Sequence, residues 1–210
     1  MAKQIQGVYE KILTCAKEEF LEKGYTDASL RTIAAKAETT TGSIYTRFGD
    51  KEGLFRAIAD PVVDGIMQLF CETQEKFHMM DEETQKNTVQ RYSSDSMDMM
   101  LDYIYGNFDT FRLLLEAPAG TKYFNFLDEM VRIEVEYTYK YMDVIGCESV
   151  KSGAVTEDFL HMVSTAYFEG VFEVVRHNMS KEEAVKYINM LKTYHMVGFD
   201  TIFSPEKYAL

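Results

Sequence analysis

The chain has 210 residues, 46% of them hydrophobic and 27% charged, with only three prolines. This composition is typical of a compact globular protein that can form long helices, and it excludes a disordered chain. No run of eighteen apolar residues occurs, and the first twenty residues carry charges every few positions, so neither a membrane span nor a signal peptide is predicted. The three cysteines are odd in number and lack metal-type spacing, which indicates reduced thiols in a cytoplasmic protein.

The net charge of −12 is unevenly distributed along the chain. Residues 1–55 contain eight Lys and Arg against eight Asp and Glu, so the remaining residues carry the whole excess of negative charge. A strongly acidic protein is repelled by the phosphates of nucleic acid, whereas a neutral end on an acidic body favours one docking orientation. The charge pattern therefore permits nucleic-acid binding at the N-terminal end alone.

Hydrophobic periodicity predicts helices at the N-terminal end. The first helix carries apolar residues at spacings of three and four and is expected to stop before Gly24. Side chains suited to helix N-caps then open three further helices: Ser29 the second, Thr40 the third and Asp50 the fourth. The apolar residues of these segments are Ile5, Val8, Ile12, Ala16, Phe20, Leu30, Ile33, Ala34, Ala37, Ile44 and Phe48.

The rest of the chain is also predicted to be helical, since no stretch alternates with a period of two. Pro61 should kink or break the fourth helix, because proline removes a backbone hydrogen bond. Loops are expected over residues 78–88 and 150–156, with a turn at Pro118, Ala119 and Gly120. The further helices are expected at 87–105, 109–116, 123–145, 157–177 and 181–202.

The fold class expected is all-α, with a small DNA-binding domain over 1–55 and a larger helical ligand-binding and dimerisation domain over 56–210. Two short helices joined by a tight turn, after a longer helix, predict a helix-turn-helix. Its second helix must present small or polar groups to base edges and basic or hydroxyl groups to phosphates. Thr41, Gly42 and Ser43 lie where base edges would be, and Tyr45, Arg47 and Lys51 surround them.

Residues 8–55 resemble the DNA-binding region of the tetracycline-repressor (TetR) family. The resemblance implies a homodimeric DNA-binding regulator, which a small molecule releases from its double-stranded DNA operator. Two departures affect the expected affinity: Glu38 replaces the usual turn glycine, and Thr41 stands where lysine is common. Arg47, at a position often occupied by histidine, restores part of the charge. The matching residues are Ala16, Phe20, Lys23, Gly24, Tyr25, Ser29, Ile33, Ala34, Ala37, Thr40, Gly42, Ser43, Tyr45, Phe48, Lys51, Glu52 and Leu54.

The resemblance also implies residue roles in DNA binding. Thr41 and Ser43 correspond to base-reading residues, and the phosphate contacts would come from Thr40, Tyr45, Arg47 and Lys51, with Ser29 and Arg31 as further backbone anchors. Simpler roles stay open for several of them. Ser29 and Thr40 could be helix caps only, Tyr45 could be half buried in the core, and Lys51 could pair with a carboxylate.

The central part of the C-terminal region is rich in Tyr, Phe and Met, which suit a pocket for a lipophilic compound but are equally typical of an ordinary core. Glu134 is exceptional, because helical spacing places its carboxylate in the middle of an apolar and aromatic face. A buried carboxylate needs a partner, and we favour an internal one over a cationic ligand. The candidate ligand contacts are Met100, Tyr103, Phe111, Met130, Glu134 and Tyr137.

The last two helices each carry an apolar face, and the resemblance implies that they form the homodimer as a four-helix arrangement. No enzyme is predicted, since the four histidines are scattered and neither a phosphate loop nor a nucleophile with its base is recognisable. No cofactor or metal is expected. A helical interaction protein or an enzyme without DNA binding remains the alternative.

Overall fold

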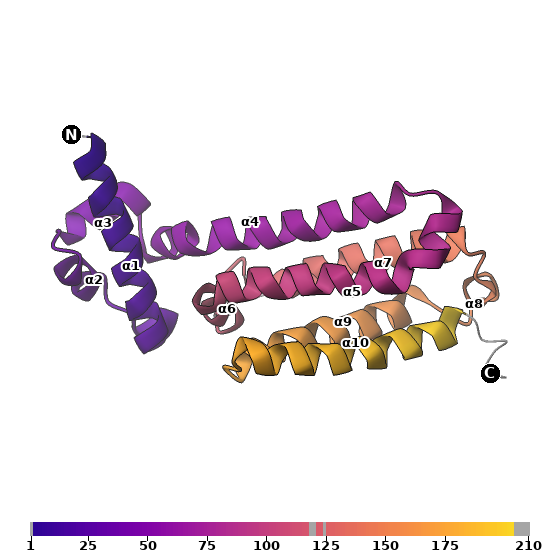
Figure 1. The fold of residues 1–210 in the computed structure, drawn as a ribbon. Coiled ribbons are helices and arrows are strands. Elements are labelled where there is room, and N and C mark those ends of the chain that lie inside the picture. Colours follow the sequence, from indigo (N-terminus) through magenta and orange to yellow (C-terminus); the bar gives the residue numbers. More distant parts are fainter. Residues whose placement is uncertain (1, 118–120, 124, 204–210) are drawn as a thin grey trace. The chain divides into compact units, whose positions relative to one another are not determined.

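The computed structural model describes residues 2–117, 121–123 and 125–203, and within them every regular element is an α-helix (Figure 1). The predicted all-α fold class is therefore confirmed. Contacts divide the chain into two compact units. The first contains Met1–Gly65 and Asn107–Phe124, and the second contains Ile66–Gly106 and Asn125–Leu210.

The first unit is built from α1 (Ala2–Asp27), α2 (Leu30–Lys36), α3 (Thr41–Phe48), the first turns of α4 (Lys51–His78) and α6 (Phe108–Leu115). The N-caps predicted from the sequence are confirmed. Ser29 Oγ accepts a hydrogen bond from Thr32 N at 3.4 Å, and Thr40 Oγ1 accepts one from Ser43 N at 3.1 Å. Asp50 Oδ1 accepts a hydrogen bond from Gly53 N at 2.7 Å, so side-chain oxygens satisfy the first free amides of all three helices.

Helix α1 extends beyond the predicted stop, although its geometry changes at Gly24. This glycine has a φ of 74° and a ψ of 166°, so it separates the main part of the helix from a short final segment. The predicted break at Pro61 is wrong, because α4 is continuous from Lys51 to His78. Pro61 is exposed, and on that side of the helix water can hydrogen-bond the carbonyl that the proline leaves free.

The core of the first unit lies where α1, α2, α3 and α4 meet. Phe20 and Phe55 are almost fully buried and pack edge to face, with ring centroids 5.4 Å apart. Helix α6 packs against α1, so a segment from the middle of the chain completes this unit. The boundary expected between residues 55 and 56 stays a prediction. Other fully or nearly fully buried residues of this unit include Ile12, Ala16, Ile33, Ala34, Ala37, Ile44 and Leu54.

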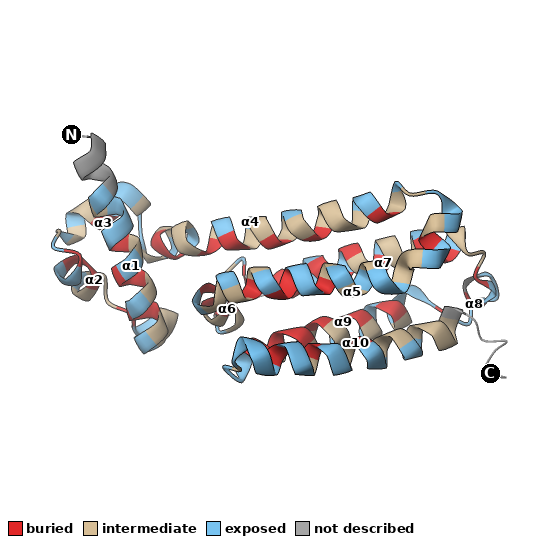
Figure 2. Ribbon diagram, viewed as in Figure 1, coloured by how far each residue is buried: buried red, intermediate tan, exposed pale blue. Residues whose placement is uncertain are grey.

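The second unit contains α5 (Glu82–Gly106), α7 (Phe126–Val144), α8 (Glu148–Lys151), α9 (Glu157–Arg176) and α10 (Lys181–Phe203), together with the rest of α4. Helix α7 packs along α9, and α10 packs on both α9 and α5, so these helices run side by side in Figure 1. Apolar side chains on their inward faces form the core, as the buried positions in Figure 2 show. Among the most deeply buried are Met130, Val131, Leu160, Phe168, Val171, Phe172, Val174, Val175 and Ala184.

Two element boundaries differ from those expected. Helix α5 begins at Glu82, about one turn earlier than predicted, because Asp81 caps it by accepting hydrogen bonds from the amide and hydroxyl of Thr84. Helix α8 overlaps the start of the loop predicted over 150–156. The turn predicted at Pro118, Ala119 and Gly120 lies outside the described residues. Among the helices that are described, none combines the length and apolar character needed to cross a bilayer.

Candidate functional site

Helix α3 exposes the N-terminal end that the sequence predicts to meet DNA. Ile44 is fully buried against the rest of the first unit, whereas the side chain of Tyr45 is 54% exposed. Gly42 and Arg47 are exposed, and Thr41 and Ser43 are half-buried. One face of this short helix therefore anchors it to the core and the opposite face carries hydroxyl, amide and guanidinium groups.

The turn before α3 tolerates a non-glycine residue in a left-handed conformation. Glu38, which replaces the usual glycine, has a φ of 53°. Its carboxylate forms an ion pair with Lys11 at 2.8 Å, which ties the turn to α1. The departure noted in the sequence thus leaves the helix-turn-helix geometry in place.

The fold of this chain does not require a glycine at position 42. A Cβ atom added there would meet only Thr40 Oγ1, at 3.7 Å. The missing side chain instead leaves the backbone of the first turn of α3 open to a molecule approaching from outside. Such close approach is what base-edge recognition in a major groove requires.

The basic residues of the first unit differ in how far they are engaged by the protein itself. Arg47 donates from Nη1 to Ser43 O at 3.2 Å and to the Ser43 hydroxyl, so it lies along α3. Arg31 is exposed, and in the described part of the chain it forms no hydrogen bond or ion pair. Lys51 donates to the carbonyls of Thr26 and Ala28, at 2.8 and 3.3 Å, and so holds the end of α1.

Ser29 and Thr40 are helix caps, as the simpler interpretation proposed, and Lys51 pairs with backbone carbonyls rather than with a carboxylate. These contacts are compatible with binding phosphate but do not require it. Tyr45 is 54% exposed, so it is accessible from outside and also partly covered by the protein. The DNA roles of all nine candidates stay predictions.

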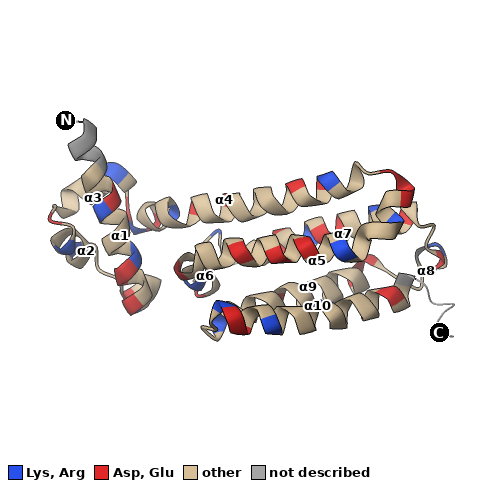
Figure 3. Cartoon of the chain, in the orientation of Figure 1, with Lys and Arg blue, Asp and Glu red and all other residues tan. Residues whose placement is uncertain are grey.

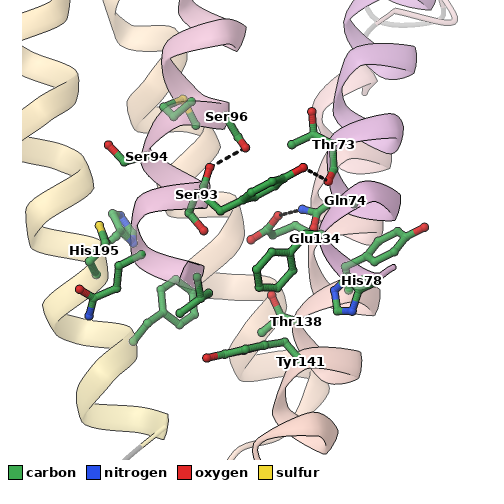
Figure 4. Close-up of a pocket in the computed structure, with 18 of the residues that line it drawn as sticks. Thr73, Gln74, His78, Ser93, Ser94, Ser96, Glu134, Thr138, Tyr141 and His195 are labelled. Atoms are coloured by element: carbon green, nitrogen blue, oxygen red, sulfur yellow. Dashed lines mark hydrogen bonds between the residues drawn. The ribbon is translucent and has the colours of Figure 1, made fainter. Parts of the chain in front are cut away.

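The second unit contains a cavity of about 890 Å³ between α4, α5, α7, α9 and α10. Figure 4 shows Glu134 of α7 pointing toward Gln74 of α4, with Thr138 and Tyr141 farther along α7 and His195 on α10. Gln74 Nε2 donates a hydrogen bond to Glu134 Oε2 at 2.7 Å. The internal partner expected for this carboxylate is therefore present, and it is a neutral amide.

Three of the six candidate ligand residues line this cavity, namely Met100, Glu134 and Tyr137. The other three are placed elsewhere. Met130 is fully buried in the core on the same helix as Glu134, and Phe111 is fully buried in the first unit. Tyr103 lies on α5 outside the cavity lining. Helical spacing alone does not distinguish a cavity wall from other positions on a partly apolar helix, so the sequence cannot separate these three residues from the cavity lining.

Sequence analysis missed several polar residues of the cavity. Lys192 of α10 is 7% exposed, and its ammonium donates to Asp98 Oδ1 at 2.7 Å and to Ser94 Oγ at 3.0 Å, both on α5. The one available signal was a lysine between the apolar positions Leu191 and Tyr194 of a helix. Its partners are about a hundred residues away in the chain, so no local pattern could identify them.

Burial changes the ionisation of the groups around the cavity. It raises the pKa of Glu134 to about 7, although the hydrogen bond from Gln74 opposes this shift. Burial lowers the pKa of His195, and burial together with the charge of Lys140 lowers that of His78. Both histidines are therefore neutral at neutral pH, while Glu134 is divided between its charged and neutral forms.

Comparison with known proteins identifies the N-terminal region. A family model described as bacterial regulatory proteins of the tetR family matches residues 12–58. Over these residues the chain is similar to the DNA-binding region of the TetR family. The HTH-type transcriptional regulator YvdT of Bacillus subtilis is 47% identical over 60 residues, which cover 29% of this chain and 31% of that protein. Rv0767c of Mycobacterium tuberculosis is 34% identical over 68 residues, or 32% of this chain and 30% of that protein.

Solved structures of TetR-type regulators share the whole fold. A transcriptional regulator from Aquifex aeolicus superimposes with a TM-score of 0.61 at 20% identity, covering 90% of this chain and 98% of that one. The TetR-family regulator PfmR of Thermus thermophilus gives a TM-score of 0.54 at 20% identity, covering 91% and 96%. The sequence matches span about a third of the length of the curated relatives. For the C-terminal unit the likeness to solved structures shows a shared fold and nothing more.

Proposed function

We propose that this protein is a member of the TetR family and a sequence-specific DNA-binding transcriptional regulator, a repressor that a small molecule releases from its operator. The observation that carries this proposal is the exposed N-terminal end of α3, with Thr41, Gly42, Ser43 and Tyr45 on its outward face. The family consists of transcriptional regulators rather than enzymes, and in the described residues no group of His, Cys, Asp and Glu could hold a metal ion.

In this proposal, different side chains of the first unit contact base edges and phosphates. Thr41 and Ser43 read base edges in the major groove, and the open backbone at Gly42 allows the approach. Phosphates are held by the side chains that surround this end of α3 and by the start of α2. The phosphate contacts are Ser29, Arg31, Thr40, Tyr45, Arg47 and Lys51.

The proposed homodimer forms through α9 and α10. Several large apolar side chains on these helices are exposed in the single chain, which is unusual for a surface that faces only water. A partner chain covering them would make the four-helix arrangement, and binding to successive major grooves requires two copies of α3 about 34–36 Å apart. The exposed residues are Met162, Val185, Met190, Tyr194 and Val197.

The proposed effector is a lipophilic or cationic small molecule that occupies the cavity of the second unit. The volume of about 890 Å³ is within the range of small-molecule sites, and aromatic and methionine side chains form much of its wall. Because such a regulator acts on DNA, we also infer a cytoplasmic location.

A gel shift with the DNA upstream of its own gene, at two or more salt concentrations, tests the DNA-binding proposal. Affinity should fall steeply with salt, and Arg47→Ala should reduce the slope by about 1, because one fewer phosphate is neutralised. Arg91→Ala is the matched control, since it removes an equally charged, 88% exposed side chain from α5 of the second unit. Absence of binding at low salt, or equal slopes for the two variants, would refute the proposal.

A further inference from the structure

We propose that the cavity ligand is an organic cation with aromatic or apolar groups, and that the Glu134 carboxylate is its counter-ion. This inference rests on the proposed function only in taking the cavity as the effector site. The chemistry of the site itself comes from the surroundings of Glu134 on α7.

The carboxylate of Glu134 is incompletely satisfied by the protein. Its single hydrogen bond comes from Gln74, a neutral donor, and reaches only Oε2. In the described part of the chain Oε1 accepts no hydrogen bond, and no Lys, Arg or His forms an ion pair with Glu134. The residue lines the cavity, so a bound molecule can reach it. Because Glu134 is half-buried and its carboxylate has no cationic partner among the described residues, a positively charged ligand group would be favoured there.

The other ionisable groups that line the cavity leave this role open. On α10, Lys192 is neutralised by Asp98 of α5 at 2.7 Å, and His195 is kept neutral by burial. On α4, His78 is likewise neutral. The remaining groups are Lys86 of α5, paired with Glu82 at 3.7 Å; Glu148 of α8, paired with Lys151 at 2.9 Å; Asp200 of α10; and the phenols of Tyr92, Tyr137, Tyr141 and Tyr167.

The walls around Glu134 suit a cation with apolar substituents. Rings from five helices line the cavity, and the face of an aromatic ring attracts cations. Tyr137 already displays this behaviour, because the ammonium of Lys140 lies 4.0 Å from its ring centroid. The Tyr167 ring lies close enough for the charge of Glu134 to raise its pKa, in addition to the effect of burial. A flat cation would thus meet a carboxylate and aromatic faces together.

The neutral form of Glu134 is the competing solution. With a pKa of about 7 the carboxyl is readily protonated in the empty cavity, which relieves the cost of burial without any ligand. A cavity that kept Glu134 protonated would take neutral molecules as readily as cations. The two possibilities therefore differ in how the charge of the ligand affects its affinity.

The experiment compares two probes that differ in one methyl group and one charge, an N-methylated styrylpyridinium dye and its uncharged styrylpyridine parent. Binding to the full-length protein is measured by calorimetry at pH 8, where the parent is neutral. We expect the cation to bind about tenfold or more tightly than the parent, as one charge-assisted contact with an aromatic wall would give.

Two variants test whether the preference for the cation depends on the Glu134 carboxylate. Glu134→Gln should weaken binding of the cation about tenfold and leave the parent within about twofold, because it removes the charge and keeps the shape. Glu148→Gln removes a carboxylate from the same cavity that is already paired with Lys151, so it should leave both affinities unchanged. Equal affinities of the two probes for the wild type, no binding of either, or equal losses in both variants would overturn the proposal.

A gel shift on the same preparations keeps this inference separate from the regulator proposal. If the protein binds DNA but shows no preference for the cation, the cationic ligand is refuted and the regulator proposal stands. If the cation binds through Glu134 but the protein never binds DNA, the ligand class stands and the regulator proposal fails.

Discussion

Replacing Glu134 by glutamine should stabilise the ligand-free protein by about 3 kcal/mol at pH 8, but by less than about 1 kcal/mol at pH 5. The pKa of this carboxyl is about 7 in the folded protein and 4.5 in its ordinary state. Between these values the unfolded chain loses the proton while the folded chain keeps it. Each increase of one pH unit in this interval therefore lowers the free energy of unfolding by about 1.4 kcal/mol.

The sign follows from the raised pKa of an acid. The contribution of Glu134 to stability is fully present below pH 4.5, falls as the pH rises toward 7 and is constant above that. Glutamine does not titrate, and its amide oxygen can still accept the hydrogen bond from Gln74. The free energy of unfolding of the variant should therefore not fall over this pH range as that of the wild type does.

Urea unfolding of both proteins at pH 5, 6, 7 and 8, at one protein concentration, measures this difference. Taking the difference between the two proteins cancels the contributions of groups that both contain, including His78 and His195. We expect the stability gain of the variant to grow from just under about 1 kcal/mol at pH 5 to about 3 kcal/mol at pH 8. A gain that does not change with pH, or a loss of stability at pH 8, would refute the reasoning.

Two further substitutions test the packing of the first unit by thermal unfolding. In Gly53→Ala a Cβ atom would lie 1.8 Å from the Phe48 carbonyl oxygen, so we expect the free energy of unfolding to fall by about 1–3 kcal/mol. Gly42→Ala is the control and should cost far less, because position 42 is open. Equal effects of the two substitutions would contradict this reasoning. Tyr123→Phe removes a hydrogen bond from the buried hydroxyl to the carboxylate of Asp60 and should cost about 1–2 kcal/mol, and an unchanged Tm would contradict that contact.

Local features of the fold could be predicted from the sequence because they depend on neighbouring residues. The caps at Ser29, Thr40 and Asp50 each join a side chain to an amide three residues later, so the sequence contains both partners. Pro61 was misjudged because its effect depends on which side of α4 faces water. The inclusion of α6 in the first unit was also not predictable, since its contacts with α1 join distant parts of the chain.

The same distinction separates the two candidate sites. The outward end of α3 is a continuous segment, so its hydroxyl and basic residues could be found by reading along the chain. The cavity is formed by residues from different helices. Spacing along α7 correctly singled out Glu134 as a carboxylate on an apolar face, but Gln74 lies 60 positions away and Lys192 meets Asp98 across 94. Such pairs appear only when the helices are packed.

The ionisation cost of Glu134 connects the stability of the second unit with its proposed ligand. A carboxylate that lowers the free energy of unfolding by about 3 kcal/mol above pH 7 is a poor choice for a purely structural position, where glutamine or leucine would serve better. Groups that act against the fold are expected where function requires them. A cationic ligand would provide the missing charge, so the same residue would weaken the empty cavity and strengthen the occupied one.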